Sequence, residues 1–162
     1  MESITSIKLF LRNYKESRAT LVKQIQEYIN VRNQLTFVSS DMLQKTIGVD
    51  IKASRATYRL DSRLEELTSS IAETKEEVNE AVSNLNSKLP TPKTKEGLID
   101  NDTLTSIINQ IQQQSVLECI IVDKLLSADG ALIDADSLTT LIACFEYPPY
   151  LVEAELDALL LI

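Results

Sequence analysis

The most constraining feature of this sequence is a heptad repeat of apolar and tyrosine side chains near its start. The side chains recur three, four or seven residues apart, at Ile4, Ile7, Leu11, Tyr14, Leu21, Ile25, Tyr28 and Leu35. With Leu11 at heptad position a, the d positions hold Tyr14, Leu21, Tyr28 and Leu35. A repeat sustained over about four heptads predicts a coiled-coil helix.

Two arginines interrupt the a positions of this repeat, which read Leu11, Arg18, Ile25 and Arg32. A charged residue at position a costs stability and selects a partner or a register. In one interpretation each arginine meets an acidic residue of another chain. In the other, each extends along the apolar stripe with its guanidinium in water. The residues leave both interpretations open, although a parallel homodimer in register would place arginine against arginine.

A second apolar stripe follows an interruption near residues 37–41, where Asp41 is placed to cap a new helix. The stripe comprises Leu60, Leu64, Leu67, Ile71, Thr74, Val78, Ala81 and Leu85. We therefore expect residues 1–86 to form coiled-coil helices with a break near 37–41. Apolar residues beside the first stripe suggest that more than two helices meet in cross-section.

Residues 87–102 hold two of the four prolines and one of the three glycines, which predicts a linker. A helical hairpin subdomain is expected over 103–162. Its first helix has eight apolar or cysteine residues among the eleven from Val116 to Leu126, which indicates burial on several sides. The predicted fold is all-α, with a long coiled-coil hairpin followed by a small C-terminal helical bundle.

The stretch SADGALIDADSL, from Ser127 to Leu138, resembles a calcium loop at first sight. A calcium loop of the EF-hand type needs oxygen ligands at positions 1, 3 and 5, glycine at 6 and glutamate at 12. No register that uses Asp134 or Gly130 satisfies this pattern. We interpret Gly130 as a residue that ends one helix, and Asp134 or Asp136 as the N-cap of the next.

Composition excludes most chemistry. The chain has no histidine, the commonest general base and metal ligand. Cys119 and Cys144 lie in apolar runs, cannot build a zinc site alone, and are interpreted as free thiols of a reducing compartment. The three glycines are isolated, so no phosphate-binding loop exists. We expect no enzyme activity, no metal, no cofactor and no small-molecule ligand.

The net charge of −8 is concentrated in residues 101–162, which carry ten acidic side chains and one basic. Such a chain is expected to bind neither nucleic acid nor an anionic membrane directly. Met1 is followed by ESITSIK rather than an apolar run, so we expect no signal peptide. No run approaches the ~18 apolar residues of a membrane span.

The layout resembles the C-terminal half of the UEV-bearing ESCRT-I subunit, the vacuolar-sorting or tumour-susceptibility protein that ends in a steadiness box. The resemblance covers residues 60–162 loosely and 104–156 best, and rests on Leu125-Leu126, Gly130, Ile133-Asp134, Asp136, Leu138 and Tyr150. The chain departs from the family in Pro148 and Pro149, in a turn two residues longer, in its acidic C-terminal third and in lacking the UEV domain. The resemblance implies a core subunit that assembles with other helical chains in endosomal sorting.

We therefore predict a non-catalytic structural subunit of a hetero-oligomeric helical complex, ESCRT-I-like in its sharpest form, which is cytoplasmic and peripheral on endosomal membranes through the complex. The alternative is a self-associating coiled-coil scaffold or tether of a cytoskeletal or kinetochore-type assembly. The residues predicted to bind partner helices are Leu11, Arg18, Ile25, Arg32, Leu60, Leu64, Leu67, Ile71, Val78, Leu117, Ile121, Leu125, Leu156 and Leu160.

Overall fold

In the computed structural model, the described residues of the chain form five helices. They are α1 (Glu2–Gln44), α2 (Ile51–Ser87), α3 (Asn101–Leu126), α4 (Ala135–Glu146) and α5 (Glu153–Leu161). The structure describes residues 2–44, 51–87, 101–127, 130 and 133–161, with the side chains of these residues except 2–4, 39–44, 51–54 and 101. No strand occurs in this described part, so the predicted all-α fold class is confirmed.

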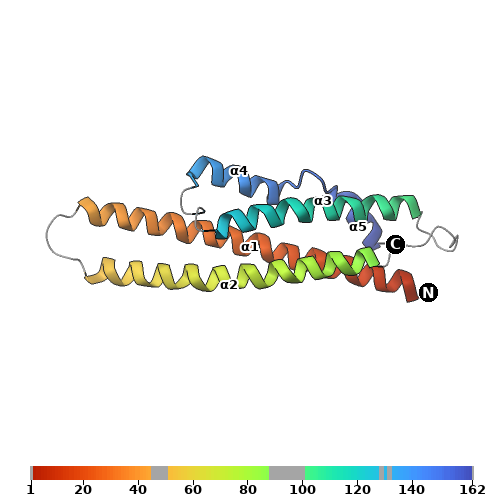
Figure 1. Cartoon of the computed structure of the whole chain (residues 1–162), viewed down its shortest axis with the longest axis horizontal. Helices are drawn as coiled ribbons and strands as arrows, with labels where there is room; N and C mark the ends of the chain where they lie inside the picture. Colours follow the sequence, from red (N-terminus) through yellow and green to blue (C-terminus); the bar gives the residue numbers. More distant parts are fainter. Residues whose placement is uncertain (1, 45–50, 88–100, 128–129, 131–132, 162) are drawn as a thin grey trace.

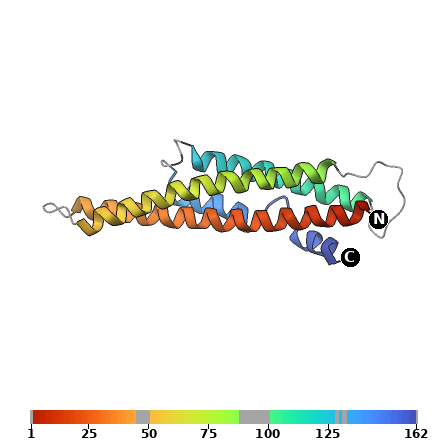
Figure 2. The ribbon, with the colours of Figure 1, turned by 90° about the horizontal axis from the view of Figure 1, so that it is seen from below.

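Helices α1 and α2 lie side by side as a long antiparallel hairpin (Figure 1 and Figure 2). The two stripes found in the sequence supply the side chains between them. Tyr14 and Leu21 of the first stripe and Ile71 and Leu85 of the second are all at most 2% exposed. The heptad spacing thus places one apolar face of each helix against the other, as the predicted hairpin requires.

The predicted break near residues 37–41 is wrong, because α1 continues without interruption to Gln44. The segment from Leu35 to Gln44 contains neither proline nor glycine, so nothing in it removes a helical hydrogen bond or frees the backbone. Thr36 stays within the helical pattern, and its hydroxyl donates to the Arg32 carbonyl oxygen at 3.0 Å. Asp41 therefore lies inside a helix rather than capping one.

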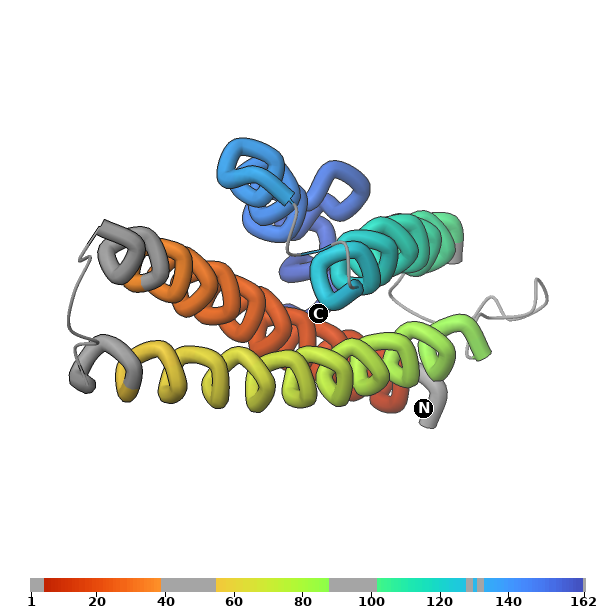
Figure 3. The backbone as a smooth tube through the Cα atoms, turned by 60° about the vertical axis from the view of Figure 1, so that its left-hand side comes forward, coloured from red at the N-terminus to blue at the C-terminus, as the bar shows by residue number. Residues whose placement is uncertain are grey.

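The remaining three helices fold back along the hairpin. Helix α3 packs against α2, whereas α4 and α5 contact α1, and Figure 3 shows α3 and α4 beside the hairpin rather than beyond its end. An apolar core shared by the five described helices runs from Ile7 and Leu11 to Leu156 and Leu159. Residues 103–162 consequently share the core of the hairpin, where a separate subdomain was expected. The predicted linker, 87–102, lies outside the described residues between 88 and 100.

The structure confirms Asp134, rather than Asp136, as the N-cap of α4. The Asp134 carboxylate accepts a hydrogen bond from the Ser137 backbone N–H at 2.7 Å, and this bond lowers the pKa of Asp134. A Cβ at Gly130 would collide with the Leu125 carbonyl oxygen, so the turn requires glycine there. Asp129 is outside the described residues. In the described part of the chain, no three acidic, cysteine or histidine side chains gather as a metal site would need.

Candidate functional site: a buried ion pair and two open grooves

The fourteen residues predicted to bind partner helices lie mainly in the core of the chain itself. Nine are buried: Leu11, Arg18, Ile25, Leu67, Ile71, Val78, Ile121, Leu125 and Leu156. Five are partly buried: Arg32, Leu60, Leu64, Leu117 and Leu160. Their apolar stripes are covered by helices of the same chain, so the buried nine present no surface to another chain in this structure. Of the five, Leu60 and Leu117 border open grooves.

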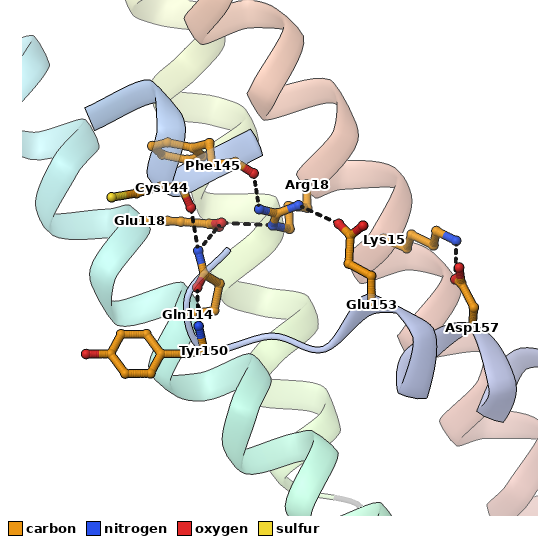
Figure 4. A network of polar contacts seen from close by, with 9 residues as sticks. All are labelled: Lys15, Arg18, Gln114, Glu118, Cys144, Phe145, Tyr150, Glu153 and Asp157. Carbon is orange, nitrogen blue, oxygen red and sulfur yellow. Dashed lines mark hydrogen bonds and ion pairs between the residues drawn. The ribbon is translucent and has the colours of Figure 1, made fainter. Parts of the chain in front are cut away.

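Arg18 forms an ion pair within the chain, a possibility that neither interpretation of the sequence included. Its Nε donates to Oε1 of Glu118 on α3 at 2.8 Å, and its Nη2 donates to the Phe145 carbonyl oxygen at 2.6 Å (Figure 4). The Glu153 carboxylate lies 3.6 Å from Nη1. The Arg18 and Glu118 side chains are only 9% and 2% exposed. One guanidinium therefore joins α1, α3, the end of α4 and the start of α5.

Gln114 extends this network along α3. Its amide nitrogen donates to Oε1 of Glu118 at 2.8 Å and to the Cys144 carbonyl oxygen at 3.1 Å. Its amide oxygen accepts from the Tyr150 backbone N–H at 3.3 Å, as Figure 4 shows. These bonds fix the segment between α4 and α5, where Pro148 and Pro149 contribute no N–H of their own.

Burial dominates the electrostatics of the network. It raises the pKa of Glu118, although Arg18 and Gln114 stabilise the charged carboxylate. The pKa of the neighbouring Tyr14 hydroxyl is raised strongly, first by burial and then by the charge of Glu118. Glu118 Oε2 and the Tyr14 hydroxyl have no hydrogen-bond partner among the described residues. Neither of the two grooves described below is lined by Arg18 or Glu118. Within the chain, the pair connects α1 to α3.

The second a-position arginine makes a weaker contact of the same kind. Arg32 Nη2 donates to the Ile133 carbonyl oxygen at 3.3 Å, while its Nη1 is buried and bonds to none of the residues that the structure describes. This contact holds the turn before α4 against α1. Both arginines thus bind backbone or carboxylate oxygens contributed by the C-terminal third of the chain.

Two polar contacts join α2 to α3. Lys75 forms an ion pair with Asp123 at 2.5 Å, and the Cys119 thiol donates to Oδ1 of Asn79 at 3.1 Å. Burial raises the pKa of Cys119, so its thiol is less reactive than an exposed one. Cys119 and Cys144 are both free thiols, each partly buried.

An open groove of about 780 Å³ lies between α2 and α3 and is called here the α2–α3 groove. Its lining consists of Asn79, Val82, Ser83, Asn86, Gln112, Gln113, Ser115, Val116, Leu117, Ile120 and Tyr150. Val116 and Ile120 are each 61% exposed, although they belong to the most apolar stretch of the sequence. The expectation that this stretch is buried on several sides therefore fails on one face of α3.

A second groove, of about 610 Å³, lies near the hairpin end where α1 leads to α2 and is called the tip groove. It is lined by Asn33, Gln34, Phe37, Val38, Ala56, Arg59 and Leu60. The hairpin extends past α3 and α4 at this end (Figure 1), which leaves the two helices uncovered there. Phe37 and Tyr58 are 74% and 73% exposed.

Sequence reasoning missed these exposed residues because it followed the core positions of the repeats. Phe37, Val116 and Ile120 lie off the two stripes, or in a run too apolar for one face to be distinguished. One signal was available: Phe37 and Val38 are apolar residues next to the place where the first stripe ends. Apolar side chains outside a repeat mark surface that the repeat itself does not bury.

No family model, curated protein or solved structure matches this chain. Over the described residues, no helix combines the length and apolarity that crossing a membrane would take.

Proposed function

We propose that the chain is a non-catalytic subunit of a hetero-oligomeric helical complex, and that its tip groove docks a helix of a partner subunit. The observation that carries the proposal is the exposure of Phe37 in an apolar groove between two helices that no other described helix covers. Exposed aromatic side chains beside a groove are typical anchors of helix-in-groove recognition.

Charge defines the partner further. Arg59 lines the tip groove and Arg55 lies one helical turn before it; both are exposed, and neither forms an ion pair with a residue that the structure describes. A partner helix with apolar residues three or four positions apart and acidic residues beside them would complement this surface. Opposite charges at the rim would speed association and select the partner more than they would raise affinity.

ESCRT-I-like endosomal sorting and protein transport is the sharpest form of the proposal. Its support is the resemblance of residues 104–156 to the C-terminal core of the UEV-bearing subunit. In that form the chain is cytoplasmic and reaches endosomal membranes only through its complex. Its partners are other helical subunits, with no part for nucleic acid, a small-molecule ligand or direct membrane insertion.

The test compares variants of the full chain in pull-downs followed by reconstitution with the purified partner. Phe37→Asp and Arg59→Glu should each abolish or strongly weaken binding of a helical subunit. Exchanging an acidic residue of that subunit for arginine should restore binding to Arg59→Glu. Recovery of ESCRT-I subunits among the bound chains would support the endosomal form specifically.

Tyr147→Asp is the matched control, because Tyr147 is 79% exposed but lies at the end of α4. This variant should bind like the wild-type chain. Equal loss of binding in the Phe37 and Tyr147 variants, or binding that ignores both Phe37→Asp and Arg59→Glu, would refute docking at the tip groove.

A further inference from the structure

The α2–α3 groove differs from the rest of the surface in carrying no charge. A quarter of the residues in this chain are charged, yet none of the eleven that line the groove is. All the α3 residues of the lining except Ile120 belong to a run from Thr103 to Leu117 without any charged residue. The lining therefore offers no charged side chain with which a charged partner could form an ion pair.

Several residues of the groove lining are apolar and exposed to solvent. Val116 and Ile120 are four residues apart on α3, so they share one face of the helix, and both are largely exposed. Val82 contributes from α2, and Tyr150 stands at the edge with 48% of its surface exposed. An exposed apolar surface bordered by polar residues is characteristic of a protein-protein contact.

We propose that this groove is the contact between two copies of the chain, with α3 of each copy antiparallel to α3 of the other. Each copy carries a net charge of −8, so two copies repel unless they meet on a neutral face. The groove is a face of that kind. A two-fold contact must also be complementary to itself, because the same residues meet from both sides.

The polar lining supplies this self-complementarity. Gln112 and Gln113 carry carboxamides, each with a donor and an acceptor, so one copy can bond to the same groups of the other. An ionised rim of one sign would lack this property.

The pairing involves a surface distinct from the tip groove, and it does not depend on the function proposed above. If the tip groove also docks a partner, one dimer offers two such grooves and binds a multivalent partner with higher avidity. The two surfaces respond differently to salt: added salt should weaken docking at the arginines of the tip, whereas it should not weaken pairing of two neutral faces on negatively charged chains.

Sedimentation equilibrium of the full chain tests the proposal. The wild-type chain should approach twice its mass of 18.1 kDa as concentration rises. Val116 lies at the middle of the α3 segment 112–120 that borders the groove, so in an antiparallel pair it faces the Val116 of the other copy. Val116→Lys and Val116→Glu should each weaken the dimer by roughly tenfold or more, because like charges then meet. An equimolar mixture of the two variants should restore it.

Leu9→Lys and Leu9→Glu are the matched controls, since Leu9 is a 53% exposed apolar residue on α1, away from the groove lining. They should leave the dimer unchanged, and circular dichroism should show that all four variants remain helical. A wild-type chain that stays at 18.1 kDa up to about 1 mM would overturn the proposal. So would Val116 variants that dimerise like the wild type, or a mixture that stays monomeric.

Discussion

The Arg18–Glu118 pair should be the most sensitive polar contact in this fold. Arg18→Met removes the guanidinium and keeps an apolar side chain of similar length. The Glu118 side chain, which is only 2% exposed, then loses its cation. Removing one partner of a buried pair costs about 3–5 kcal/mol. A domain of this size is stable by about 5–15 kcal/mol, so the variant should lose a large share of its stability.

The partner substitution should cost less. Glu118→Leu leaves Arg18 with the Phe145 carbonyl oxygen at 2.6 Å and the Glu153 carboxylate at 3.6 Å. Loss of a hydrogen bond to a charged group costs about 1.5–3 kcal/mol. The double variant, which replaces both charges by apolar side chains, should be much more stable than the sum of the single losses predicts, because no uncompensated charge remains.

The pH dependence follows from the raised pKa of Glu118. The folded chain binds the Glu118 proton more tightly than the unfolded chain does. Stability from this group is therefore greatest below the ordinary glutamate pKa and falls as pH rises through the raised one. Arg18→Met removes a cation that opposes this rise, so its deficit relative to the wild type should be larger near pH 7 than near pH 4.

Urea denaturation followed by far-UV circular dichroism measures all four chains at both pH values. The wild type, the two single variants and the double variant form a complete cycle. If Arg18→Met costs less than about 1 kcal/mol, the value of an exposed ion pair, at both pH values, the contact is not the buried connection described here.

Three further variants probe the packing. Gly130→Ala should lower the melting temperature, because its Cβ would meet a backbone carbonyl oxygen of α3 that cannot easily move. Leu67→Asp should lower the melting temperature strongly, since burying a carboxylate at this position costs several kcal/mol. Glu76→Ala, on the exposed face of the same helix, should change the melting temperature little. Chains 1–87 and 101–162, expressed separately, should copurify because they share one core; recovery of each alone, folded, would contradict that core.

Local periodicity was sufficient to predict the hairpin, because the heptad positions of each long helix depend only on residues a few positions apart. It could not predict what covers the outer sides of that hairpin. Arg18 and Glu118 are 100 residues apart, and neither heptad contains information about the other. A signal was nonetheless present: Glu118 is the single charged residue between Thr103 and Val122, in a helix expected to be buried on several sides. A lone carboxylate in such a helix needs a cation, and an arginine at position a needs an anion.

The grooves were harder to predict, because exposure depends on where other helices end. Val116 and Ile120 are of the same residue types as Ile121 and Val122, which are buried nearby on the same helix. Only the position of α2 and of the α4–α5 segment decides which of the four is covered. Phe37 is exposed for a similar reason, since α1 extends past α3.

The closed arrangement also limits how a partner can bind. A partner helix that packed on core positions of α3, such as Ile121 or Leu125, would have to displace the helices of the same chain that cover them. Those helices compete at an effective concentration on the order of millimolar. A partner at the tip groove displaces nothing. The two routes predict different effects of a less stable core. Arg18→Met should increase partner binding if the chain must open, and should leave it unchanged if the partner docks at Phe37. Titration of the purified partner against both chains, at a temperature where each is folded, decides between them. Tighter binding to Arg18→Met would mean that the core positions first identified in the sequence are the docking surface after all.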